Sequence, residues 1–159
     1  MVNNEITKEQ LLIEYQKVAA ELCKIKKEFN LILNNIPAMV FKGYADWSVD
    51  FYSTRVEEMI GYSKNDFDSR QLKWTDILLE EDMERTKFPF IKALKTDRNY
   101  VREYRIKSKN GQIIWIQERS YIVCDSNGKI DYISGIFFDI TEQVLNESLL
   151  QYCESLEEM

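Results

Sequence analysis

The stretch YRIKSKNGQIIWIQERSYIVCDSNGKIDYISGIFFDITEQ, residues 104–143, decides the fold. Its long runs are rich in β-branched and aromatic residues, and Asn-Gly pairs at 110–111 and 127–128 separate them. Asn-Gly between such runs is the strongest short-range signal for a β-hairpin, because both central positions of the tight turn need a positive φ. The sequence therefore predicts an antiparallel meander of three strands. The expected strands span 99–107, 113–124 and 130–140.

Two shorter strands are expected upstream of the meander, over 38–44 and 48–53, around a turn at 45–47. Apolar side chains fall on both faces of the strands at 113–124 and 130–140. A sheet with one solvated face alternates more cleanly. We therefore expect both faces to be covered, one by helices and the other by the N-terminal helix or a second subunit.

Short helices are expected between the two groups of strands, over 54–60 and 74–79. A longer helix should begin at the acidic run 80–82, since acidic residues favour a helix N-terminus, and should end near Lys95. Pro89 lies inside this longer helix. Proline lacks an N–H and crowds the preceding turn, so we expect Pro89 to kink or split the helix.

A long helix is expected at the start of the chain, because residues 7–35 contain neither Gly nor Pro. Thr7 and Gln10 fit a capping box. Apolar residues then recur in alternating steps of four and three, which is the heptad of a coiled coil. The expected dimer-facing positions are Leu11, Tyr15, Val18, Leu22, Ile25 and Phe29. Leu12 and Leu33 widen this stripe, which also suits a helix that packs on its own domain, and both arrangements stay open.

A second heptad segment ends the chain, with Asp139 or Thr141 as the expected N-cap. Its apolar residues are Leu145, Leu149, Tyr152, Leu156 and Met159. The repeat still runs at the last residue, so we expect a further segment to follow. The expected organisation is a helix over 1–35, a mixed α/β domain over 36–141 and a C-terminal helix over 142–159.

Composition narrows the class of protein. The chain has 159 residues, a formal net charge of -6 and 45% hydrophobic residues, which is typical of a globular domain. The acidic balance argues against a nucleic-acid binder, because phosphate contacts need clustered Lys and Arg. Three cysteines without CxxC spacing, no signal-peptide pattern and no long apolar run predict a cytoplasmic chain without a membrane span.

Three segments in this order resemble the PAS domain family, also called the sensory box, with its C-terminal PAC-type motif. They are FYSTRVEEMIGYSKNDF (51–67), WTDILLEEDMER (74–85) and the stretch 104–143 quoted above. Leu79 and Glu80 depart from the pattern, because the family often has His-Pro there. The resemblance implies an α+β PAS fold, in which a five-stranded antiparallel sheet carries short helices on one face and has coiled-coil-like helices at both ends.

The resemblance also implies a function in prokaryotic signal transduction. Such modules sense a ligand or an interface change and relay it through flanking helices to an output domain, such as a histidine kinase or a diguanylate cyclase, outside this chain. Asp139, Ile140 and Thr141 match the junction between sheet and output helix. The alternative is a ligand-free PAS module that acts as a dimerisation and signal-relay element. Either module is expected to be a homodimer and not an enzyme.

Family topology places a ligand cavity between the sheet and the helices. The resemblance implies a lining of Phe41, Trp74, Ile77, Phe88, Ile91, Tyr104 and Trp115. Arg102 and Arg119, by contrast, read as surface residues or cross-strand ion pairs. Cys124 reads as a small packed residue.

The cofactor is unknown from the sequence, but two kinds are argued against. The chain has no histidine, which excludes a His-ligated haem and a Ser-His-Asp catalytic set. Residues 74–82 contain no cysteine where light-sensing relatives form a cysteinyl-flavin bond. Non-covalent flavin stays open, and no metal site is expected.

Overall fold

A computed structural model describes residues 6–159, which form two compact units, residues 6–36 and residues 37–159. The first unit is a single helix, α1 (Lys8–Asn35). The predicted capping box is confirmed: Gln10 N donates to Thr7 Oγ1 (3.2 Å), and Thr7 N donates to Gln10 Oε1 (3.0 Å). The heptad residues recur along one face of this helix, as their spacing requires.

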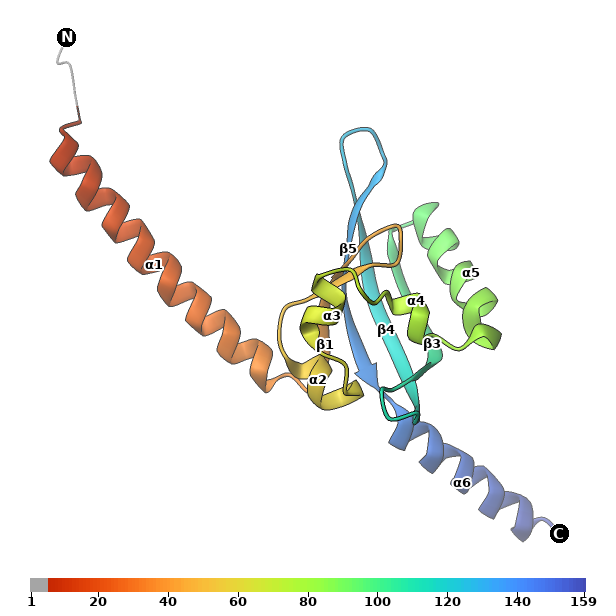
Figure 1. The fold of residues 1–159 in the computed structure, drawn as a ribbon. Helices are drawn as coiled ribbons and strands as arrows, with labels where there is room; N and C mark the ends of the chain where they lie inside the picture. The colour runs from red at the N-terminus through yellow and green to blue at the C-terminus, as the bar shows by residue number, and fades with distance from the viewer. Residues whose placement is uncertain (1–5) are drawn as a thin grey trace. The chain divides into compact units, whose positions relative to one another are not determined.

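The second unit is built on a five-stranded antiparallel sheet (Figure 1). Its strands are β1 (Met39–Gly43), β2 (Val49–Phe51), β3 (Asn99–Lys107), β4 (Ile113–Cys124) and β5 (Ile130–Asp139). The spatial order is β2-β1-β5-β4-β3, so β1 and β5, the first and last strands in the sequence, are neighbours within the sheet. The predicted meander is confirmed, but its turns differ from the tight two-residue type, because only the glycine of each Asn-Gly pair has a positive φ, 87° at Gly111 and 78° at Gly128.

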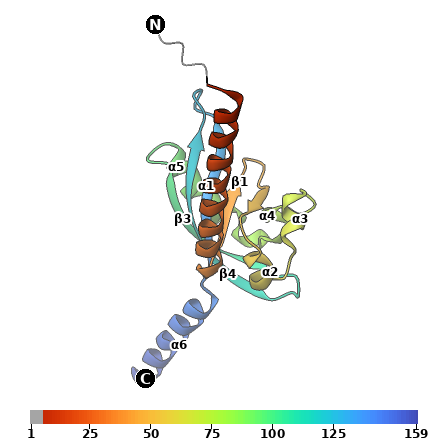
Figure 2. The same ribbon diagram turned by 90° about the vertical axis from the view of Figure 1, so that its left-hand side faces the viewer.

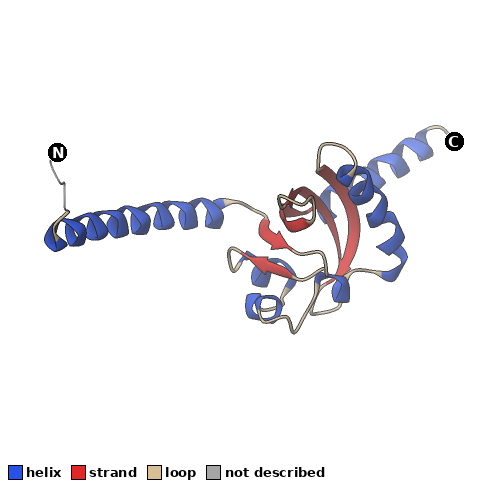
Figure 3. Cartoon of the chain, turned by 90° about the horizontal axis from the view of Figure 1, so that it is seen from above, coloured by secondary structure: helices blue, strands red, loops and turns tan. Residues whose placement is uncertain are grey.

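The connecting segment between β2 and β3 is helical, as Figure 3 shows by colour. Its helices are α2 (Arg55–Ile60), α3 (Lys64–Asp68), α4 (Trp74–Ile77), the 3-10 turn η1 (Glu80–Asp82) and α5 (Met83–Leu94). Val56, Phe67 and Trp74 from these helices join the inner side chains of the sheet in one core. The expectation that helices cover one sheet face is confirmed, and the cover of the other face stays a prediction.

Pro89 lies inside α5 and does not split it, so the expectation of a split helix is wrong. Proline removes one hydrogen bond, the one to the carbonyl of the residue four positions earlier, which here is Arg85. Arg85 lies on the exposed side of the helix, so water can hydrate that carbonyl oxygen. The remaining turns are anchored by Thr86 and Ala93, which are buried against the sheet.

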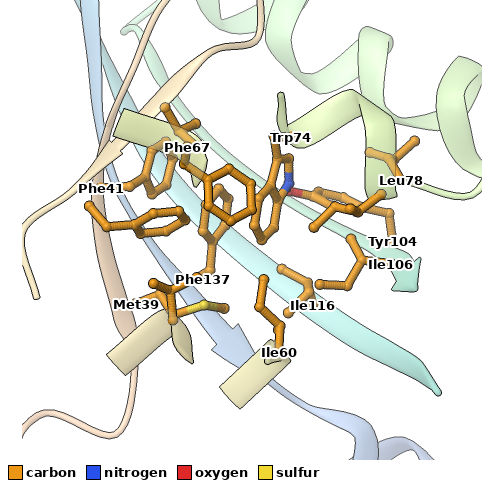
Figure 4. Close-up of a cluster of buried hydrophobic side chains, with 14 of the residues drawn as sticks. Met39, Phe41, Ile60, Phe67, Trp74, Leu78, Tyr104, Ile106, Ile116 and Phe137 are labelled. Atoms are coloured by element: carbon orange, nitrogen blue, oxygen red, sulfur yellow. The ribbon is translucent and has the colours of Figure 1, made fainter. Parts of the chain in front are cut away.

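Three stacked aromatic rings form the centre of the core (Figure 4). The Phe137 ring lies 3.9 Å from Phe41 and 4.2 Å from Trp74 between centroids, with interplanar angles of 2° and 3°. Gly135 pairs with Phe41 across the strands. A Cβ at Gly135 would lie 2.7 Å from the Phe41 ring and 2.2 Å from Ser120 Oγ, so only glycine lets this ring lie flat on β5.

The C-terminal helix α6 (Thr141–Glu157) follows β5 directly (Figure 2). Its N-cap position is Ile140, whereas the sequence predicts Asp139 or Thr141. Asp139 nevertheless accepts a hydrogen bond from the first helical residue, since Thr141 N donates to Asp139 Oδ1 (2.9 Å). Within residues 6–159, none of the helices is both long enough and apolar enough to cross a membrane.

Candidate functional site: an aromatic cavity with a buried ion pair

A cavity of about 190 Å³ lies among the inner face of the sheet, the β1–β2 turn and α5. Its walls are mainly aromatic. They include Phe41, Trp47, Trp74, Phe90, Tyr100 and Phe137. Arg102 and Glu118 supply the charged part of the lining. The site therefore combines an apolar chamber with one polar end, the usual character of a small-molecule pocket.

Glu118 is the centre of this polar end, and it is 1% exposed. Arg102 lies directly opposite on β3 and donates two hydrogen bonds, from Nε to Oε2 (2.8 Å) and from Nη2 to Oε1 (3.1 Å). Tyr100 Oη donates to Oε1 (2.7 Å), and Tyr104 Oη donates to Oε2 (2.8 Å). Ser120 Oγ donates to Oε1 as well (3.1 Å). Five hydrogen bonds thus fill the accepting capacity of the carboxylate.

The Arg102 guanidinium is held on its other sides too. Nη1 donates to the main-chain oxygen of Thr86 in α5 (2.8 Å), which ties the sheet to the helix. Its Cζ lies 4.9 Å from the centroid of the Trp47 ring, a cation–π distance. Burial is the largest single influence and opposes the charge, but the combined attractions of Glu118, Tyr104 and Tyr100 outweigh it and raise the pKa of Arg102 above its usual value. Arg102 is therefore a fixed, permanently charged part of the lining.

The two tyrosine hydroxyls of this cluster donate hydrogen bonds to Glu118 and keep their protons. Burial raises the pKa of Tyr100 and of Tyr104 above the ordinary value, and the negative charge of Glu118 raises both further. Tyr104 Oη also accepts a hydrogen bond from Trp74 Nε1 (2.8 Å), visible in Figure 4. The aromatic stack and the ion pair are thus joined by one chain of hydrogen bonds.

The residues expected to line the cavity fall into two groups. Phe41, Trp74 and Ile91 line it, and Tyr104 lies behind Trp74 with no exposed surface. Ile77, Phe88 and Trp115 do not line it. Ile77 is buried elsewhere in the core.

Phe88 and Trp115 lie outside the cavity for geometric reasons. Phe88 is 72% exposed, because it follows the cavity-lining Lys87 by one residue and one residue turns a helix by about 100°. Trp115 lies three residues before Glu118, and alternation along a strand puts it on the opposite sheet face. Both positions depend on which way each residue faces on its helix or strand, and the resemblance alone does not determine that direction.

The lining residues that sequence reasoning missed include Trp47, Tyr100, Glu118 and, as part of a cavity, Arg102. A signal for two of them exists in the strand pattern. Alternation puts Glu118 on the same side of β4 as Ile116 and Ile122, which marks it as a charge among core residues. The predicted cross-strand ion pair of Arg102 is present, but it is buried.

A second ion-pair cluster lies at the edge strand β3. Asp82, 2% exposed, accepts hydrogen bonds from Arg105 at its main-chain N (2.8 Å), Nε (3.0 Å) and Nη2 (2.7 Å). Arg85 Nη2 lies 3.2 Å from the same carboxylate. Arg85 and Arg105 also approach the Trp115 ring, with Cζ to centroid distances of 5.8 and 5.5 Å. Hydrogen bonds from Arg105 hold the pKa of Asp82 below its ordinary 3.8.

This lowered pKa predicts an acid-sensitive contribution to stability. Asp82→Asn should reduce the free energy of unfolding at pH 7 by about 2 kcal/mol, since charge-assisted hydrogen bonds are lost. The folded-state pKa lies below the unfolded one, so the contribution is fully present above about pH 4. It disappears as the pH falls through the folded-state pKa.

Urea unfolding at pH 7 and pH 3 measures this contribution. The free energies of unfolding of wild type and Asp82→Asn should differ less at pH 3 than at pH 7. Asp131→Asn, at an exposed position, is the matched control and should behave as wild type at both pH values. A gap between Asp82→Asn and wild type that widens in acid would contradict the assignment.

The start of α6 is attached to the main chain of Trp115 in β4. Ile140 N donates to Trp115 O (2.9 Å), and Trp115 N donates to Thr141 Oγ1 (2.9 Å). Asp139 completes the turn through its bond to Thr141 N. The three junction residues therefore come together at one point of β4, three residues from Glu118.

The part of the chain that the structure describes contains no cluster of metal ligands and no disulfide. Across residues 6–159, no group of three or more potential metal ligands among His, Cys, Asp and Glu is present. The cysteines are unpaired, with Cys23 and Cys153 exposed and Cys124 half-buried.

The chain is similar to known sensory proteins. The family model described as PAS fold matches residues 49–137. A methyl sulfide methyltransferase-associated sensor of Methanosarcina acetivorans is 32% identical over 128 residues, covering 79% of this chain. This chain spans 13% of the length of that relative.

Solved structures agree with the family match. A sensory box histidine kinase/response regulator from Burkholderia thailandensis superposes with a TM-score of 0.65, at 21% identity, over 82% of this chain and 98% of that one. The N-terminal domain of a diguanylate cyclase with a PAS/PAC sensor, from Marinobacter aquaeolei, gives a TM-score of 0.53 at 20% identity, over 67% and 97%. Since the family match covers more than half of the sequence, this chain belongs to the PAS fold family.

Proposed function

We propose that this chain is a sensory module whose cavity takes a small ligand and whose β4 strand relays the change to α6. One observation carries the proposal: β4 contributes Glu118 to the cavity and, three residues earlier, the main-chain groups of Trp115 to the α6 junction. A hydrogen-bonded strand is stiff along its length, so movement at Glu118 reaches the junction directly. Relay then consists of repacking at the start of α6.

The output domain is proposed to lie outside this chain. The chain spans a small fraction of its sensor relative, and its structural neighbours come from a histidine kinase and a diguanylate cyclase. We propose that α1 and α6 pair with the same helices of a second copy. The apolar residues Leu145, Leu149 and Leu156 of α6 are exposed within their unit and keep heptad spacing, which suits such a pairing.

The junction is tested by Thr141→Val, which removes the hydroxyl that accepts from Trp115 N. Hydrogen exchange at the first amides of α6, such as Val144, should speed up by about fivefold, because the lost bond contributes about 1 kcal/mol. Thr75→Val in α4 is the matched control and should leave α6 unchanged. Unaltered exchange in Thr141→Val would mean that the junction bond does not hold α6.

Coupling to the cavity is tested in the same measurement by Phe90→Leu, which changes the cavity wall. We expect Phe90→Leu alone to change the rate of hydrogen exchange in α6. The change should be smaller when Phe90→Leu is combined with Thr141→Val. Phe90→Leu with no effect on α6 would refute the relay.

A second candidate, a ligand-free dimerisation module, is favoured by the same exposed stripe of α6. Native mass spectrometry and an absorption spectrum of freshly purified protein separate the two. The sensor predicts a dimer that gains mass on binding a small molecule. A dimer that never binds one would support the ligand-free module, and a monomer at micromolar concentration would contradict the helix pairing in both.

A further inference from the structure

We propose that the cavity takes one uncharged, single-ring molecule whose ring packs among the aromatic walls and whose carbonyl or similar neutral oxygen accepts hydrogen bonds from Arg102. This inference rests on the proposed sensory function and names the class of ligand. Four features carry it: the volume of the cavity, its aromatic walls, the N–H groups that Arg102 has left, and the charge balance at the polar end.

The volume limits the ligand to about one ring. The cavity measures about 190 Å³. An apolar cavity of about 150 Å³ in another protein holds one benzene molecule. The present cavity therefore has room for a benzene-sized ring with a small substituent. The three fused rings of a flavin or the macrocycle of a haem require several times that space.

The walls favour a flat ligand. Phe41, Phe137 and Trp74 already form a parallel stack, and their edges and faces bound one side of the cavity. Phe90 packs edge-on against Tyr100 on the other side, with centroids 5.6 Å apart. Offset stacking and edge-to-face contacts with such rings stabilise an aromatic guest beyond the area that it buries.

Arg102 has hydrogen-bonding capacity left at the polar end. A guanidinium carries five N–H groups, and three of them bond to Glu118 and Thr86. One N–H remains on each terminal nitrogen, with no acceptor among residues 6–159. Arg102 is 8% exposed, so bulk water has little access to these groups. A ligand oxygen would satisfy them.

The charge balance selects a neutral oxygen. Glu118 already neutralises Arg102, and Lys87 at the rim pairs with Glu84 (2.5 Å). A carboxylate would have to leave water without meeting a net positive charge, which is costly in a cavity with low polarity. A cation would find Glu118 saturated by its five hydrogen bonds. An uncharged carbonyl meets neither penalty.

The test uses four probes of the same size: benzamide, benzoate, benzamidinium and toluene. Binding to the full chain at pH 7 is measured from shifts of the Trp47 and Trp74 indole N–H signals by NMR. Benzamide should bind at least tenfold more tightly than each of the other three, which is the factor that one good hydrogen bond provides. Tighter binding of benzoate or benzamidinium, or equal binding of toluene, would overturn the inference.

The role of Arg102 is tested by the double substitution Arg102→Met with Glu118→Gln, which leaves no buried charge unpaired. Its affinity for benzamide should fall at least tenfold, to the level of toluene, while toluene is unaffected. Phe88→Ala, on the exposed side of α5, is the matched control and should bind all probes as wild type does. If the double variant fails to fold, nuclear Overhauser effects between benzamide ring protons and the Trp47 indole in the unchanged chain decide instead, and their absence refutes the site.

Failure of this inference and failure of the proposed function give different results. If no probe binds but Phe90→Leu still alters α6 exchange, the ligand class is wrong and the relay stands. If benzamide binds and α6 exchange never responds to the cavity, the ligand class stands and the relay is wrong.

Discussion

Glu118→Leu is expected to lower the free energy of unfolding by about 3–5 kcal/mol, because it leaves the buried Arg102 charge and two buried tyrosine hydroxyls without their acceptor. A chain of this size has a total stability of about 5–15 kcal/mol, so the variant should lose a large fraction of it. Urea denaturation followed by far-UV circular dichroism measures the loss.

Glu103→Leu is the matched control for this substitution. Glu103 lies on the same sheet, on the opposite face, where it is exposed and bonds only Gln117 (2.8 Å). The identical chemical change there should cost less than about 1 kcal/mol. Equal losses of unfolding free energy in the two variants would show that the buried cluster stabilises the fold no more than the exposed Glu103 does.

Trp74→Ala is expected to cost about 3–5 kcal/mol, the range for removing a fully buried aromatic side chain. The indole is 1% exposed, stacks on Phe137 and donates to Tyr104. Its removal opens a void next to the cavity and leaves the top of the stack uncovered. The midpoint temperature of thermal unfolding should fall by about 6–20 degrees.

Trp74→Phe separates stacking from hydrogen bonding. Phenylalanine keeps a ring against Phe137 but loses the N–H, so we expect a cost of about 1–2 kcal/mol. Trp115→Ala, on the other sheet face, is the second comparison and should be milder than Trp74→Ala because that ring is only half-buried. A loss below 1 kcal/mol in Trp74→Ala would contradict the packing described here.

The strands could be predicted from the sequence because their signals are local. Two Asn-Gly pairs set both turns of the meander, and the capping box of Thr7 and Gln10 set the start of α1. The course of α5 through Pro89 could not be predicted in the same way. Whether one lost hydrogen bond breaks a helix depends on how the other turns are anchored, which is a tertiary property.

The candidate site was predictable only in part. Phe41, Trp74 and Ile91 were found because the resemblance places β1, α4 and α5 around the cavity. Glu118 was missed because a charged residue in a strand normally faces water. Its burial depends on Tyr100 and Tyr104 meeting it from β3, and pairing between strands is not written in the local pattern.

The attachment of α6 through the main chain of Trp115 and the side chain of Thr141 has a consequence for protein engineering. A foreign helix grafted after Thr141 keeps every bond of the junction, so this residue is a natural fusion point. Each residue inserted beyond it turns the following helix by about 100° and advances it by about 1.5 Å. A graft lengthened by seven residues should therefore restore the original facing, and the output of such fusions should rise and fall with that period.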